Sequence, residues 1–341
     1  MDPIIIKLLA AVVLGFVLTA ALGKVVIPAL RRMKAGQSIK EDGPTWHMAK
    51  QGTPTMGGVM FILAVMVTVL VLNASAILAG DLTSVFVLLF SLVFGLIGMV
   101  DDYAKIKKKE NTGLTASQKF LLQLAAAVLF TVLLRNFGIL SPNLYIPFLG
   151  IEWKLPWVVY MIFAAFVITG CVNSVNITDG VDGLASSVTL VVSVFFTACF
   201  TYAHLMWNTT GSAGMAVFAA ALAGGLVGFL VYNFHPAKVF MGDTGSLFLG
   251  GAVCGMAFAL DMPLILILVG IIYIAETMSD IIQVGYFKLT HGKRIFRMAP
   301  LHHHLEMGGW SEKKLCYVFA GITLVCCILA FIGVMGRFPA L

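Results

Sequence analysis

Five short polar segments interrupt an otherwise apolar chain, and they contain the residue types that bind phosphate and divalent metal. They are residues 50–58, 101–109, 173–183, 233–246 and 300–306. Their most distinctive members are five aspartates: Asp101, Asp102, Asp179, Asp182 and Asp243. Mg²⁺ prefers oxygen ligands and is usually bound by one or two carboxylates together with substrate phosphates. Aspartates beside lysines and glycine-rich turns therefore predict metal-assisted chemistry on a phosphate substrate.

Helix capping is the alternative explanation for these acids, because Asp favours the N-cap position. Capping accounts for Asp182 or Asp243 taken singly. It does not account for Asp101 and Asp102, which are expected at the end of a helix, where the helix dipole disfavours anions. Two adjacent carboxylates at that place repel each other and need a compensating cation. The pair is therefore predicted to be functional.

Lysines and histidines accompany the acids. Lys105 and Lys107–Lys109 suit a diphosphate or anionic lipid headgroups, although each lysine taken singly is better explained as a positive anchor on the cytoplasmic side. Adjacent side chains rarely aim at one ion, so His302, His303 and His304 are predicted to donate to phosphate or sugar oxygens rather than to bind zinc. Phe240 is open to two explanations, as a stacking surface for a base or as an interfacial aromatic residue.

The elements that must position these residues are membrane helices. Of the 341 residues, 60% are hydrophobic and 11% are charged, whereas soluble domains carry about 25% charged residues. So few charges could not cover a water-facing surface, which indicates that lipid surrounds most of the chain. The six cysteines all lie in apolar runs and are expected to be buried hydrophobic residues. The fold class is therefore an all-α polytopic membrane protein.

Ten apolar segments are long enough, or nearly so, to cross a bilayer. They are 4–29, 56–79, 84–100, 118–136, 157–175, 184–203, 212–232, 245–260, 263–285 and 315–336. A capping box, Thr115 to Gln118, is expected to open the fourth of these helices. The stretch 137–156, which is rich in Pro and Gly, predicts a small hairpin. With no repeat or linker visible, residues 1–341 are interpreted as one domain.

Basic residues set the expected orientation. Most Lys and Arg residues lie in the loops that lead from odd to even spans, and only Arg135, Lys154 and Arg337 lie in the opposite loops or at the C-terminal end. By the positive-inside rule, all five polar segments are cytoplasmic and both termini are external. Residues 284–299 alternate basic and apolar side chains, which predicts a surface-lying amphipathic helix that could guide a lipid phosphate.

Three motifs resemble those of the polyprenyl-phosphate N-acetylhexosamine-1-phosphate transferase superfamily: Asp101-Asp102, the run from Asn173 to Gly183, and Gly242-Asp-Thr-Gly-Ser246. Three further motifs narrow the resemblance to the bacterial phospho-N-acetylmuramoyl-pentapeptide transferases. They are Gly52 to Gly58, Asp101 to Lys105, and Pro300 to Glu306.

This resemblance implies Mg²⁺-dependent transfer of phospho-MurNAc-pentapeptide from UDP-MurNAc-pentapeptide to undecaprenyl phosphate, in the bacterial cytoplasmic (inner) membrane, giving lipid I and UMP. Asp243 would be the metal ligand, and Asp101 and Asp102 would activate the lipid phosphate or help to hold the metal. Lys105 and Lys109 would contact phosphates. The remaining substrate-binding set would hold the nucleotide and sugar and comprises Lys50, Thr55, Asn173, Asn176, Asp179, Asp182, Asn233, Phe240, Gln283, His302, His303 and His304. The resemblance also implies a homodimer, and no nucleic-acid partner is expected.

Two rival functions remain. The nearer is a sister transferase that uses UDP-GlcNAc, and the motifs Gly52 to Gly58 and Pro300 to Glu306 argue against it. The other is an ion-coupled transporter, which would place its polar groups near the bilayer midplane within inverted repeats. Here the acids gather at one expected membrane face and no repeat is visible.

Overall fold

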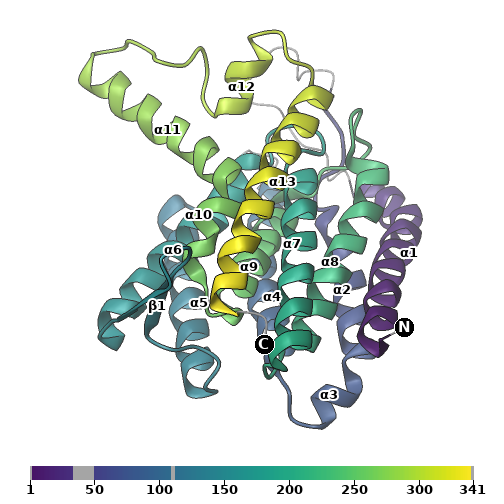
Figure 1. Ribbon diagram of the computed structural model, residues 1–341. Helices are drawn as coiled ribbons and strands as arrows, with labels where there is room; N and C mark the ends of the chain where they lie inside the picture. Colours follow the sequence, from purple (N-terminus) through teal and green to yellow (C-terminus); the bar gives the residue numbers. More distant parts are fainter. Residues whose placement is uncertain (1, 34–49, 109–111, 339–341) are drawn as a thin grey trace.

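The computed structural model describes residues 2–33, 50–108 and 112–338, and nearly all of its regular structure is helical (Figure 1). The helices and strands, in chain order, are α1 (Pro3–Arg32), α2 (Gly58–Leu72), α3 (Ala74–Leu78), α4 (Thr83–Lys108), α5 (Ala116–Asn136), β1 (Asn143–Ile146), β2 (Ile151–Lys154), α6 (Trp157–Thr178), α7 (Leu184–Trp207), α8 (Ser212–Asn233), α9 (Gly242–Ala259), the 3₁₀ helix η2 (Pro263–Ile265), α10 (Leu266–Val269), α11 (Ile271–Leu289), α12 (Leu301–Glu306) and α13 (Glu312–Arg337).

Seven of the described helices are long and apolar enough to cross a membrane, which supports a multi-pass membrane protein. They are α1, α4, α5, α6, α7, α8 and α13. The pair α10–α11 meets the same criterion only when it is taken together with η2 as one broken span. Each of the ten expected segments coincides with a helix or a group of helices, but α2 has 15 residues and α9 is not among the seven. The count of ten spans therefore stays a prediction.

Helices α8 and α9 form the centre of the bundle. Every residue of α9 from Thr244 to Phe258 is buried, and 83% of the most apolar stretch of α8 is buried. In contrast, only 22% of that stretch in α1 and 33% in α13 is buried. The outer helices therefore present apolar side chains such as Phe166, Leu78 and Val25 to their surroundings, as expected of a surface that faces lipid.

Small residues let α1 pack closely against α8. A Cβ atom added to Gly15 would lie 2.5 Å from the carbonyl oxygen of Ala221, so a larger residue would force the two helices apart. Without a hydrophobic driving force in lipid, close backbone approach of this kind is how membrane helices gain van der Waals contact.

The ninth expected span is broken, and the arm that follows it differs from the prediction. The axes of η2–α10 and α11 differ by 79° at Gly270, and Figure 1 shows α11 projecting away from the bundle. The amphipathic helix predicted for 284–299 is wrong beyond Leu289, where α11 ends. His291 and Gly292 have φ of 53° and 113°, and residues with positive φ cannot continue a right-handed helix.

The opposite end of the bundle holds the predicted hairpin. Strands β1 and β2 pair antiparallel, with Asn143 opposite Lys154. In Figure 1, the start of α1, the end of α13 and this hairpin lie in the lower half, whereas α12 lies at the top. The capping box at Thr115 is confirmed, since its side chain and that of Gln118 each accept the other's backbone N–H.

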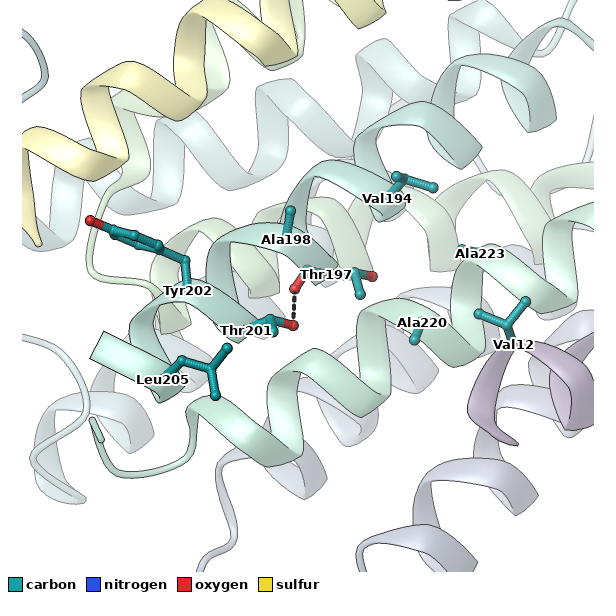
Figure 2. A pocket seen from close by; sticks show the side chains of 9 residues that line it. All are labelled: Val12, Val194, Thr197, Ala198, Thr201, Tyr202, Leu205, Ala220 and Ala223. Atoms are coloured by element: carbon teal, nitrogen blue, oxygen red, sulfur yellow. Dashed lines mark hydrogen bonds between the residues drawn. The ribbon is translucent and has the colours of Figure 1, made fainter. Parts of the chain in front are cut away.

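An apolar pocket of about 520 Å³ lies among α1, α7 and α8 (Figure 2). Its wall includes Val12, Val194, Ala220 and the Thr197–Thr201 pair, in which the Thr201 hydroxyl donates to the Thr197 carbonyl oxygen. None of its lining residues is charged. The pocket is thus an apolar recess of the bundle, separate from the aspartates.

Candidate active site

Three of the predicted aspartates meet although they come from two distant helices. Asp101 and Asp102 lie on α4 and Asp243 lies in the first turn of α9, and one oxygen of each falls within 4.8 Å of the others. The prediction that Asp101 and Asp102 end their helix is wrong, because α4 continues to Lys108. The carboxylates therefore meet through helix packing: α4 lies against α9 along most of its length.

Two ammonium groups balance this charge. Lys105 Nζ lies 2.7 Å from Asp101 Oδ2 and 3.0 Å from Asp243 Oδ2, so the compensating cation expected for the aspartate pair is present. Lys119, from the first turn of α5, lies 2.8 Å from the same oxygen of Asp243. Three carboxylates and two ammonium groups thus share one small volume, in which electrostatic interactions are stronger than in water.

Asp102 has a structural role that its local sequence did not reveal. Its Oδ1 accepts the backbone N–H of Asp243 at 3.2 Å, and its Oδ2 accepts both the N–H and the hydroxyl of Thr244 at 2.9 and 2.7 Å. Asp102 therefore caps α9 from a helix that lies about 140 residues earlier, where free N–H groups and the helix dipole favour an anion. Capping thus explains Asp102, and Asp243 is left free of that role.

The turn before α9 needs glycine for two reasons. Gly242 has φ of 68°, a left-handed conformation that other residues rarely adopt. A Cβ atom at this position would also lie 2.5 Å from Asp102 Oδ2 and 2.7 Å from Thr55 Oγ1. The absence of a side chain thus brings the predicted residue Thr55 beside the aspartates.

The segment between α6 and α7 contributes two more predicted residues. The Asn176 amide donates to Asp243 Oδ1 at 2.8 Å and to Ser246 Oγ at 2.7 Å, which orients the Asp243 carboxylate. Asp179 directly follows α6, and burial together with the negative charges of Asp243 and Asp102 raises the pKa of its carboxyl well above the usual value. Among the described residues no cation forms an ion pair with Asp179, so Asp179 has no structural ion-pair role there and stays a candidate ligand-binding group.

A second charged cluster surrounds Asp182. Lys50 Nζ lies 2.7 Å from Asp182 Oδ1 and 2.6 Å from Glu312 Oε2. The second oxygen of Asp182 accepts the backbone N–H of Ala237 and lies 3.2 Å from His235 Nδ1. Lys50 and Asp182 were both predicted to bind nucleotide or sugar, and the structure brings them into contact.

The three histidines have separate surroundings. His302 is buried, and its Nδ1 lies 2.8 Å from the buried carboxylate of Glu276. His303 Nδ1 lies 2.7 Å from Glu306, and His304 Nδ1 accepts the backbone N–H of Arg297. The three rings thus have different hydrogen-bond partners. That they donate to phosphate or sugar oxygens and do not bind zinc stays a prediction.

Several predicted substrate-binding residues form hydrogen bonds within the protein. Asn173 bonds Gln123 on α5 and the Thr169 carbonyl. Buried Asn233 accepts from Ser186 and donates to the Val239 carbonyl, and Gln283 bonds the backbone of residues 295 and 296. Their binding roles stay predictions. Phe240 is half-buried and its backbone pairs with Pro54 and Gly57, and Lys109 lies outside the described residues.

Sequence reasoning missed three contributors: Lys119, His235 and Glu312. Lys119 also fits the positive-inside rule as a basic residue near a helix end, although its place one turn after the Thr115 cap is a usable signal. Glu312 looked like an ordinary acid in the first turn of a helix, which the helix dipole favours anyway.

The aspartate cluster has the donor chemistry that a divalent cation needs. Among the described residues, Asp101, Asp102 and Asp243 offer hard carboxylate oxygens, which Mg²⁺ prefers. Asp102 is occupied by the N-terminus of α9, whereas Asp243 carries only side-chain donors. The residues therefore fit a metal bound chiefly through Asp243. Asp182, His235 and Glu312 also lie close together, but the ammonium of Lys50 sits between the two carboxylates.

Comparison with known proteins finds two matching family models. Residues 84–261, more than half of the chain, match the family model of glycosyl transferase family 4. This chain, a bundle of membrane helices with clustered aspartates and lysines, thus belongs to a class of membrane transferases. Residues 50–62 match the phospho-N-acetylmuramoyl-pentapeptide-transferase signature 1, a segment that begins at Lys50 and includes Thr55.

Relatives of full length extend the match. The chain is 46% identical over 331 residues to the phospho-N-acetylmuramoyl-pentapeptide-transferase of Clostridium acetobutylicum, covering 95% of this chain and 98% of the relative. It is 45% identical to that of Clostridium perfringens strain 13, covering 97% and 98%, and 44% identical to that of Clostridium beijerinckii, covering 96% of each. The chain therefore belongs to the phospho-N-acetylmuramoyl-pentapeptide-transferase family.

Proposed function

We propose that the protein transfers phospho-MurNAc-pentapeptide from UDP-MurNAc-pentapeptide to undecaprenyl phosphate, which yields lipid I and UMP. The observation that carries this proposal is the full-length similarity to relatives named phospho-N-acetylmuramoyl-pentapeptide-transferase. The convergence of Asp101, Asp102 and Asp243 on two lysines supports it. Transfer of a phospho-sugar places negative charge on several oxygens, and positioned cations are the groups that stabilise it.

In this proposal the lysines and Asp243 have different roles at the diphosphate. Lys105 and Lys119 present ammonium groups beside Asp243 and would offset the charge of the diphosphate and of the departing UMP. Asp243, oriented by Asn176, is the proposed ligand of Mg²⁺, with Asp101 as a further oxygen donor. When bound, Mg²⁺ supplies Lewis-acid stabilisation of phosphate oxygens.

Asp101 is the better placed of the two adjacent aspartates to act on the acceptor. Its Oδ1 accepts the Leu114 N–H and its Oδ2 pairs with Lys105, whereas both oxygens of Asp102 are engaged by the backbone of α9. Asp101 can therefore turn one oxygen towards the acceptor phosphate without unravelling a helix end. In this proposal, Asp102 acts by fixing the position of Asp243.

The nucleotide and sugar are assigned to the groups beside the aspartates. Lys50 and Asp182 offer an ammonium and a carboxylate next to each other, and Asp179 adds a carboxyl group on the same segment as Asp182. His302 lies against this segment, since a Cβ atom on Gly180 would collide with its ring. These residues thus link the segment that follows α6 to Lys50 and to α12.

The proposal includes a location and an assembly. The chain would lie in the bacterial cytoplasmic membrane with both termini outside, the site facing the cytoplasm, residues 1–341 as one domain, and two copies forming a homodimer. Cysteines placed at 108 and 147, in a variant without native cysteines, test the orientation. Impermeant label added from outside should modify position 147 only, and labelling at 108 without 147 would contradict the topology.

Substrate choice tests the reaction itself. Purified protein should convert UDP-MurNAc-pentapeptide and undecaprenyl phosphate to lipid I in the presence of Mg²⁺, and UDP-GlcNAc should give no lipid product. Product formation from UDP-GlcNAc alone would assign the chain to the sister transferases instead.

A further inference from the structure

Glu312 is an acid whose surroundings are unusual for the first turn of a helix at the outside of the bundle. Its side chain is only 11% exposed. One oxygen, Oε2, accepts Lys50 Nζ at 2.6 Å and the backbone N–H of Asp182 at 3.0 Å. The other oxygen, Oε1, lies 3.3 Å from His235 Nδ1. A single carboxylate thus joins four segments that are distant in sequence.

Helix capping does not explain this arrangement. The N-cap of α13 is Ser311, whose hydroxyl already accepts the N–H of Lys314. Glu312 instead points away from its own helix end to Lys50 and to the turn that carries Asp182. Surface ion pairs contribute little to stability, but a partly buried ammonium between two carboxylates has its long side chain fixed in one geometry.

The geometry has a consequence for a bound nucleotide. If a ligand group turns Asp182 towards itself, Lys50 loses one of its two carboxylates, and Glu312 is the group that keeps the ammonium in place. The hydrogen bond from the Asp182 N–H to Glu312 also fixes the backbone of the turn. Preorganised groups bind more tightly because less side-chain freedom is lost on binding.

We propose that Glu312 is a positioning residue for the nucleotide: it holds Lys50 and the Asp182 turn in the arrangement that binds a uridine diphosphate, without contacting the ligand itself. This inference rests on the proposed function, which assigns the nucleotide to Lys50 and Asp182. It adds α13, which carries no predicted site residue, to the elements that build the site.

Direct binding of UDP to the purified full-length protein, measured by calorimetry, tests the inference. Glu312→Ala should raise the Kd for UDP about tenfold, the scale of coupling within one charged network. Glu312→Gln keeps an acceptor oxygen and should give a smaller rise. In the double variant with Lys50→Ala, adding Glu312→Ala should raise the Kd by less than it does in the wild type, because only the contact with the Asp182 N–H is then left to lose. In transfer assays, KM for the UDP substrate should rise while kcat stays within about threefold.

Lys313→Ala is the matched control, because Lys313 is exposed on the same helix turn and should leave UDP binding unchanged. Additive effects of the Lys50 and Glu312 variants would overturn the inference. An unchanged Kd in Glu312→Gln would do so even if Glu312→Ala failed to fold. If the wild type makes lipid I but the Kd for UDP does not change when Glu312 is replaced, this inference is refuted and the proposed function is not. If the Kd for UDP depends on Glu312 but the wild type makes no lipid product, the proposed transfer is refuted and this inference is not.

Discussion

Replacing Asp243 by Asn separates the metal-binding role of this residue from a structural one. Asn keeps the size of the side chain and removes its charge. The start of α9 should be unaffected, because Asp102, not Asp243, accepts the free N–H groups of that helix. Asn176 can still donate to the remaining side-chain oxygen. The variant should therefore fold and insert normally.

The structure sets the size of both effects. The substitution removes the anion that faces Lys105 and Lys119, in pairs whose side chains are between 17% and 33% exposed. Such partly exposed pairs contribute on the order of 1 kcal/mol to stability. Loss of one key electrostatic group at a reacting centre lowers rates by about 10²–10³, and a hundredfold loss corresponds to about 2.7 kcal/mol in the barrier. Activity should fall far more than stability.

The assay is lipid I formation by purified Asp243→Asn across series of Mg²⁺ and Mn²⁺ concentrations, with Mn²⁺ binding measured separately by electron paramagnetic resonance. We expect at least about a hundredfold less product and weaker Mn²⁺ binding. Asp81→Asn is the matched control, since Asp81 accepts the Thr83 N–H in the loop before α4 and lies outside the proposed site. Activity within a few-fold of wild type, with unchanged metal dependence, would refute the assignment.

Three further predictions follow from single carboxylates. Asp102→Asn leaves one oxygen for three donors, so the free energy of unfolding should fall by about 1–3 kcal/mol in thermal melts; an unchanged melting temperature would contradict the capping role. Glu276→Gln removes the anion beside buried His302 and should lower activity about tenfold; wild-type activity would show that this pair is dispensable. Burial raises the pKa of Asp261 to about 6 even though Arg337 lowers it. The native state then binds more protons than the unfolded one between about pH 4 and 6, so Asp261 lowers stability as pH rises through that window, on the order of 3 kcal/mol in total. As the pH rises through this window, the melting temperature of Asp261→Asn should increase relative to that of the wild type. A constant difference between the two melting temperatures would refute the pKa shift.

The membrane environment and the family of this protein follow from its sequence. A chain with 11% charged residues cannot cover itself with a water-facing surface, so membrane helices follow from composition. The hairpin at 137–156 and the cap at Thr115 are local features, set by residues a few positions apart, and both are confirmed. The motifs likewise pointed to the family before any contact was known, because they are short runs of consecutive residues.

The partners of the polar residues became visible in the tertiary structure alone. Asp102 caps a helix that begins 140 residues later, Lys119 pairs with Asp243, and Glu312 reaches Lys50. Nothing in local periodicity records such partners, since they depend on how α4, α5, α9 and α13 pack. For the same reason, Asn173 looked like its neighbour Asn176 in the motif, yet it faces Gln123 one helical turn away from the aspartates. The type of a residue sets the chemistry that its side chain can perform. Its partner depends on the packing of helices that are far apart in the sequence.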